Sequence, residues 1–239
     1  MTGVQTCALP ICRCLAAAGL CMAVSAFATG VQPDTTLLVI SEAGGGQMGV
    51  KNTDNQPLLL HTTIIDLPDS KGVQLHAIPP VTRLEPNGYQ IVRFVLEKSD
   101  QPLTVQQLKR VRFEGIPPAA PKGSSTVRMS VGQDLPVVIS PKGLEQVPEP
   151  WKLITWSLVG DKIVGKNASP YVARMSQEVT LQPSGKLFKL LERPYMLPGD
   201  SIEMALPSGV DQASVTGFKL TPGSPFGFAL SPYEVTFKR

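Results

Sequence analysis

Turn-forming residues interrupt this chain so often that long helices have little room to form. The sequence has 23 prolines and 21 glycines among 239 residues, and short β-branched or leucine-rich runs lie between them. In the second half, turn signals at 160–161, 183–185 and 198–200 recur at a spacing of roughly ten residues, as short strands require. Helical periodicity is hard to find. The sequence therefore predicts an all-β fold.

A proline-rich segment divides the strand pattern in two. Residues 141–150, PKGLEQVPEP, contain three prolines and one glycine, a composition that keeps a linker extended and fairly stiff. Strand-like runs fill residues 31–140 before it and 151–239 after it. We predict two β-sandwich domains in tandem with these boundaries. Trp151 and Trp156 open the second domain and are expected to pack in its core or at the hinge.

The first 28 residues have the pattern of an export signal. An apolar run at 15–26 follows Arg13, and residues 26–28 form an A-x-A cleavage signal. All four cysteines lie in this segment, so we expect a mature chain with neither disulfides nor a thiolate metal site. Residues 2–11, TGVQTCALPI, resemble a translated sequencing adapter, which leaves the true N-terminus of the precursor open.

Composition and motifs argue against several classes of function. The net charge is only +3, and the basic residues form no phosphate-binding stripe, so no nucleic acid partner is expected. The glycine run at 44–46 lacks the Lys-Ser/Thr pair of a nucleotide-binding loop, so no ATP is expected either. His61 and His76 have no metal-ligand spacing. Ser201 lies in a Gly-Asp-Ser triplet that echoes a hydrolase nucleophile, but no histidine follows it. We predict a protein that is not an enzyme and needs no cofactor or metal.

One strand-like segment has an ambiguous face. Val127, Met129 and Val131 alternate with Arg128 and Ser130, so the three apolar side chains share one face of a strand. That face either covers the protein's own core or is offered to a partner. The pattern by itself favours the first interpretation.

A family resemblance favours the second. Residues 78–93, IPPVTRLEPNGYQIVR, resemble the diagnostic block of the periplasmic pilus-assembly chaperones, the PapD-like family. Weaker matches follow in the same order at 113–118 (FEGIPP), 167–171 (NASPY) and 195–199 (YMLPG). The resemblance covers essentially the whole mature chain. It implies two immunoglobulin-like β-sandwich domains set at an angle, a periplasmic location, and no enzymatic activity.

The resemblance also implies a mode of binding. Family members bind pilus or fimbrial subunits that lack their final strand, lend them a strand, and deliver them to an outer-membrane usher. By this resemblance Val127, Met129 and Val131 are the donor-strand residues that bind the subunit. Whether the free protein caps itself as a dimer, and which subunit it binds, stays open.

Two positions depart from the family pattern. The family anchors the subunit's C-terminal carboxylate with an Arg and a Lys in the cleft between the domains, where this chain has Leu37 and Pro136. Neither residue can donate a charge-assisted hydrogen bond, and Pro136, which lacks an N–H, is expected to interrupt strand pairing. Either the clamp is absent, or another cation such as Arg128 or Lys51 replaces it. The departure keeps an alternative open, a secreted structural or adhesive tandem β-sandwich protein without classical chaperone activity.

Overall fold

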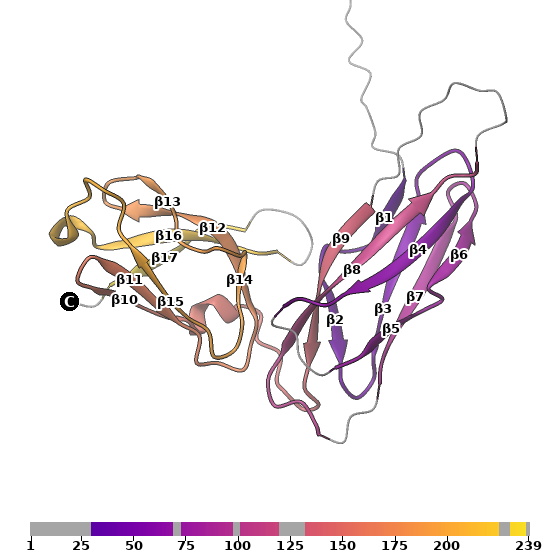
Figure 1. Cartoon of the computed structure of the whole chain (residues 1–239), viewed down its shortest axis with the longest axis horizontal. Helices are drawn as coiled ribbons and strands as arrows, with labels where there is room; N and C mark the ends of the chain where they lie inside the picture. The colour runs from indigo at the N-terminus through magenta and orange to yellow at the C-terminus, as the bar shows by residue number, and fades with distance from the viewer. Residues whose placement is uncertain (1–29, 69–72, 98–100, 120–131, 225–229, 238–239) are drawn as a thin grey trace, which may run out of the picture.

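The computed structural model describes residues 30–68, 73–97, 101–119, 132–224 and 230–237. These residues form two β-sandwiches whose long axes lie at an angle to one another (Figure 1). The prediction of an all-β chain with two tandem sandwiches is confirmed. No helix in the described ranges has the length and apolar character needed to span a bilayer.

The first domain packs a four-stranded sheet against a five-stranded one. In spatial order, the first sheet contains β1 (Val31–Pro33), β3 (Gly46–Asn52), β7 (Tyr89–Leu96) and β5 (Leu75–Ile78). The second contains β2 (Leu38–Ser41), β9 (Gly132–Ser140), β8 (Gln107–Ile116), β4 (Leu58–Ile65) and β6 (Val81–Leu84). All described pairings are antiparallel except that of β2 with β9, which is parallel.

The core of the first domain follows from the two-residue period of its strands. Along β7, Val92 and Phe94 are buried whereas Ile91 and Val95 are exposed, as expected when successive side chains point to opposite faces. The ring of Phe94 meets that of Phe113 on β8 edge-on, with centroids 6.4 Å apart. This aromatic pair joins the two sheets across the core.

The second domain repeats this architecture with a three-stranded and a five-stranded sheet. One contains β10 (Thr155–Val159), β11 (Lys162–Lys166) and β15 (Ser201–Ala205). The other contains β13 (Leu187–Lys189), β12 (Ala173–Gln182), β16 (Gly217–Pro222) and β17 (Tyr233–Thr236), with β14 (Tyr195–Met196) also paired to β12. Two short 3₁₀ segments, η1 (Pro150–Leu153) and η2 (Gln212–Ser214), lie outside the sheets.

Aromatic side chains fill the centre of the second core. Trp156 contacts Phe218 edge-on at a centroid distance of 5.0 Å, and Phe218 contacts Phe237 at 5.8 Å. Trp151 in η1 is also buried in this core. The prediction that both tryptophans have packing roles is therefore confirmed.

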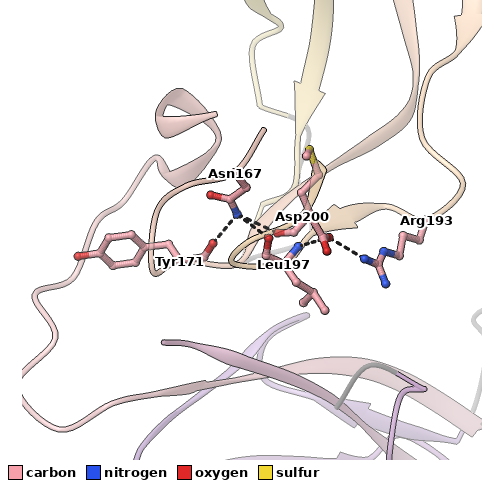
Figure 2. A network of polar contacts seen from close by, with 6 residues as sticks. Asn167, Tyr171, Arg193, Leu197 and Asp200 are labelled. Carbon is pink, nitrogen blue, oxygen red and sulfur yellow. Dashed lines mark hydrogen bonds and ion pairs between the residues drawn. The ribbon is translucent and has the colours of Figure 1, made fainter. Parts of the chain in front are cut away.

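A fully buried asparagine fastens turns together in each domain. In the second domain, Nδ2 of Asn167 donates to the main-chain carbonyls of Tyr171, Met196 and Leu197 at 2.8, 3.3 and 3.1 Å (Figure 2). Its Oδ1 accepts a hydrogen bond from the N–H of Ser169. One side chain therefore satisfies buried main-chain groups from two segments that are distant in the sequence.

Asn52 does the same in the first domain. Its Nδ2 donates to the carbonyls of Gln56, Leu84 and Glu85 at 2.9, 3.2 and 3.1 Å, and its Oδ1 accepts from the N–H of Asp54. Both asparagines have no exposed surface.

Candidate functional site

The last strand of the first domain has an open edge along half its length. On one side, β9 pairs with β8 continuously from Gly132, opposite Glu114, to Ile139, opposite Gln107. On the other side, β2 pairs only with residues 137–140 of β9. Within the described ranges, no strand pairs with residues 132–136 on that side. Apart from the N–H that Pro136 lacks, their main-chain groups on that side are available to an added strand.

Pro136 lies inside β9, at the last position of this open edge. It is directly opposite Arg110 of β8, and the register is unbroken on both sides of it. The expectation that Pro136 interrupts strand pairing is therefore wrong for the pairing with β8. The physical reason is that a proline is tolerated in an edge strand when its missing N–H is on the unpaired side, and β2 begins to pair one residue later, at Val137.

The expected donor residues Val127, Met129 and Val131 lie outside the described residues, as does Arg128. They precede the open edge directly in the sequence, because β9 begins at Gly132. Their role as donor residues stays a prediction.

A cavity of about 470 Å³ lies between the two domains. Leu37, Val39 and Val138 of the first domain form one wall. The linker and the second domain complete the lining, with residues that include Val147, Pro148, Trp151, Tyr171, Val172 and Arg174. The structure thus places Leu37, which the sequence resemblance assigned to a cleft position, at the wall of this interdomain cavity.

Apolar packing and one glutamine hold the two domains together beside the cavity. Leu108 and Val138 of the first domain pack with Val172 of the second in a separate buried cluster. The side chain of Gln106 accepts a hydrogen bond from the N–H of Val172 at 2.9 Å and donates one to Oγ of Ser140 at 2.8 Å. Its own N–H donates to the carbonyl of Pro170 at 2.8 Å. These contacts connect the end of β9 to the start of β12.

Arg174 is the charged residue among those that line the cavity. Its Nη1 is buried, and no hydrogen-bond partner for it is found among the described residues. Burial lowers the pKa of Arg174 below its ordinary value, and the positive charge of Arg110 lowers it further. The cleft therefore contains a desolvated cation with a second cation close enough to repel it.

Arg110 has a partner within its own domain. Its Nε donates to Oδ1 of Asp134 at 2.7 Å, and its Nη2 donates to the carbonyl of Asp134 at 3.0 Å. Lys51, considered above as a substitute cation, lies on β3 opposite Gln32 and Tyr89 and does not line the cavity.

Sequence reasoning missed Arg174. In the sequence it is a single basic residue in an alternating strand, which is the pattern of an ordinary solvent-facing side chain. Only the packing of the second domain against β9 and the linker reveals its burial.

The other residues considered in the sequence have surface or turn roles. His61 lies 3.9 Å from Glu114 and His76 lies 3.6 Å from Glu97, and all four side chains are well exposed. Among the described residues, no group of three or more His, Cys, Asp or Glu side chains is arranged to hold a metal ion.

The Gly-Asp-Ser triplet forms a turn. Oδ2 of Asp200 accepts hydrogen bonds from the N–H of Leu197 and from Nη2 of Arg193, both at 2.6 Å (Figure 2). Ser201 is exposed at the start of β15. The carboxylate therefore stabilises the turn before β15.

Comparison with protein families supports the sequence resemblance. Residues 30–145 match the family of pili and flagellar-assembly chaperones, PapD N-terminal domain, and residues 149–221 match the pili assembly chaperone PapD, C-terminal domain. The chain belongs to the PapD-like pilus chaperone family. The prediction of immunoglobulin-like sandwich domains is thereby confirmed, and the role that the family's name describes is assembly rather than catalysis.

Individual relatives of this PapD-like chain agree with the family match. It is 41% identical over 213 residues to the uncharacterized fimbrial chaperone YhcA of Escherichia coli strain K12, covering 88% of this chain and 92% of that protein.

Solved structures share the fold at lower identity. A chain in the complex of the Salmonella enterica SafA pilin with the SafB chaperone matches with a TM-score of 0.70 and 21% identity, covering 87% of this chain and 97% of that one. The E. coli chaperone DraB matches with a TM-score of 0.69 and 22% identity, covering 87% of this chain and 99% of its own.

Proposed function

We propose that this protein is a periplasmic chaperone that binds fimbrial subunits by strand donation and delivers them to an outer-membrane usher. Membership of the PapD-like family and the 41% identity to a fimbrial chaperone support this role. The observation that carries it is the open edge at residues 132–136 of β9, which directly follows the alternating apolar residues 127–131. Residues 1–28 act as the export signal in this proposal.

The open edge explains how such binding would work physically. An added strand forms main-chain hydrogen bonds along the free side of β9, so affinity does not depend on one particular side chain. Val127, Met129 and Val131 then fill a groove in the subunit, and burial of each contributes roughly 1.5–3 kcal/mol before ordering costs. Met129 adapts its shape readily, which suits a binder of several related subunits. In the absence of a subunit, the same edge is open to a second copy of the chain, as a self-capping dimer requires.

The test is co-expression with a fimbrial subunit encoded in the same gene cluster, followed by purification of the complex from the periplasm. Met129→Asp places a charge in the apolar groove, and we expect recovery of the subunit to fall at least about tenfold, because an unpaired buried charge is costly. Ser130→Asp is the matched control, because the sequence alternation predicts that residue 130 faces away from residue 129.

Two results would contradict this assignment. Unchanged subunit recovery with Met129→Asp would show that residue 129 does not enter a groove. An equal loss with Ser130→Asp would show that the segment tolerates no charge on either face, and that the alternation has no role in binding.

A further inference from the structure

Every second residue of β9 directs its main-chain groups toward the open side. The carbonyl of Ser140 accepts a hydrogen bond at 2.9 Å from the N–H of Glu42, which follows β2. The direction of the main-chain groups alternates along a strand, and the pairing of β9 with β8 continues without a shift. The carbonyls of Gly132, Asp134 and Pro136 therefore point to the same side as that of Ser140, where an added strand must pair.

One of these three acceptors already has a donor from the protein itself. Arg110 on β8 donates from Nη2 to the carbonyl of Asp134 at 3.0 Å and from Nε to Oδ1 of the same residue at 2.7 Å. The two side chains are only 32% and 33% exposed, so solvent ions screen their interaction incompletely. The acceptor in the middle of the open edge thus has a charge-assisted hydrogen bond before any partner arrives.

The neighbouring arginine on the same face of β8 lacks this contact. Nη2 of Arg112 lies 3.5 Å from Oδ2 of Asp134, and its side chain is 48% exposed. Among the described residues, it donates no hydrogen bond to a carbonyl of β9. Both arginines therefore place a positive charge beside Asp134, but only Arg110 engages the main chain of the open edge.

The Arg110 contact affects different partners to different extents. An added strand brings its own N–H to the carbonyl of Asp134 and competes with the guanidinium for that oxygen. A subunit that adds one strand displaces one guanidinium. A second copy of the chain that pairs edge to edge displaces two, because a twofold interface uses the same groups of both copies. The contact therefore weakens self-pairing by about the square of the factor by which it weakens subunit binding.

We propose that Arg110 protects the open edge of β9, and that this contact makes the edge bind a fimbrial subunit in preference to a second copy of the chain. An unpaired strand edge is a template for association, and charged side chains at the edge limit that association. Pro136 acts in the same direction, because it removes one N–H from the same edge. The identity of the preferred partner rests on the proposed function, whereas the protection is a property of the free protein.

The test measures self-association of the full mature chain by sedimentation equilibrium over a dilution series. We expect Arg110→Gln to lower the dimer Kd about a hundredfold, which is about tenfold for each copy. Arg110→Lys should have a smaller effect, because an ammonium group keeps the charge but lacks the planar fork that holds two oxygens. Arg112→Gln is the matched control, since it removes the same charge from the same face of β8, and it should change the dimer Kd less than about threefold.

A second variant shows whether the dimer forms through the open edge. The N–H of Asp134 points to the open side with its carbonyl, so Asp134→Pro removes a donor from that edge and leaves the pairing with β8 in place. Arg110→Gln combined with Asp134→Pro should return self-association to the level of the unmodified protein. A circular dichroism melt of each variant shows whether it is folded.

Several results would overturn the protective role of Arg110. These are an unchanged dimer Kd with Arg110→Gln, an equal change with Arg112→Gln, and a tight dimer that survives Asp134→Pro. In the co-expression experiment, Arg110→Gln should not lower subunit recovery, and a loss would show that Arg110 holds the subunit rather than obstructing the edge. If the unmodified protein recovers no subunit, the proposed function fails, and the sedimentation measurements still decide whether Arg110 protects the edge.

Discussion

The two domains use the same device for different purposes. In each, the amide of a fully buried asparagine, Asn52 or Asn167, donates to three main-chain carbonyls, one of them four residues later. In each, the amide oxygen accepts from the N–H two residues later. We call these two hydrogen-bond sets the Asn52 clamp and the Asn167 clamp.

The clamps differ in what lies next to them. The Asn52 clamp holds Gln56 and Glu85, both exposed, and none of its residues lines the interdomain cavity. The Asn167 clamp holds Tyr171, which lines that cavity and donates its hydroxyl to the carbonyl of Glu145 in the linker.

The Asn167 clamp also holds Leu197, which packs against the apolar cluster between the domains and points toward the first domain (Figure 2). The same local chemistry therefore stabilises one domain internally and, in the other, also positions the cleft.

Removal of each clamp should cause the largest loss of folding stability. Asn52→Ala and Asn167→Ala each leave several buried carbonyls without a donor, and we expect each to lower the free energy of unfolding by about 3 kcal/mol. Chemical denaturation measures both losses. If the clamps differ as described, Asn167→Ala also lowers recovery of the co-expressed subunit, whereas Asn52→Ala leaves the amount of subunit recovered per folded chaperone unchanged.

Asn55→Ala provides the control, because Asn55 is exposed in the turn next to Asn52, and it should change stability by less than about 0.5 kcal/mol. Equal losses of subunit recovery in the two clamp variants would contradict the difference between the clamps.

Substitutions at two glycines, Gly49 in the first domain and Gly165 in the second, compare how rigidly the neighbouring side chains are packed in each domain. A methyl group at Gly165 would overlap the ring of Trp156, which is buried in the second core, whereas one at Gly49 would overlap the hydroxyl end of Tyr89. We expect Gly165→Ala to destabilise the protein by about 1–3 kcal/mol through overpacking.

A methyl group at Gly49 would also overlap the carboxylate of Asp34, to which the hydroxyl of Tyr89 donates a hydrogen bond at 2.5 Å. Gly49→Ala should still cost less, because both side chains are exposed and can move into solvent together. Thermal unfolding followed by tryptophan fluorescence distinguishes the two variants. Equal destabilisation would show that Tyr89 is held as rigidly as Trp156.

The smallest expected change in stability concerns Glu42, whose carboxylate accepts a hydrogen bond from the linker. Hydrogen bonds from the main-chain N–H groups of Lys142 and Leu103 lower the pKa of Glu42 below its ordinary value. A carboxyl whose pKa is lowered by folding stabilises the folded state above its unfolded pKa, and that contribution is lost as the pH falls through the folded value.

Glu42→Gln should therefore reduce stability at neutral pH and weaken the loss of stability on acidification below about pH 4, close to the ordinary pKa of glutamate. Urea denaturation at several pH values tests this. A Glu42→Gln profile that matches the unmodified protein would refute the role of Glu42 in fastening the linker.

Much of the architecture could be predicted because strand patterns and turns are local. The turn spacing indicated short strands, and the proline-rich segment at 141–150 indicated the division into two sandwiches. The tryptophans were placed in packing roles because aromatic side chains next to apolar runs seldom stay exposed. The role of Val127, Met129 and Val131 as donor residues remains a prediction, supported by the open edge that follows them.

The candidate site could be predicted only in part. Position 37 was expected at the cleft and lines the cavity, but Pro136 was expected to break a ladder that continues through it. That error arose because the cost of a proline in a strand depends on which side of the strand has a neighbour. A sequence does not show where β2 stops pairing with β9.

The sequence by itself determined the class of fold, the two domains and the family, because hydrophobic periodicity, turn residues and the block at 78–93 are properties of short stretches. Only the tertiary structure decided which cation lies in the cleft. Arg174 is on the second domain and Arg110 on the first, and the repulsion between them and the burial of Arg174 arise only when the domains pack together. Burial and charge proximity depend on residues far apart in the chain, so no local pattern reports them.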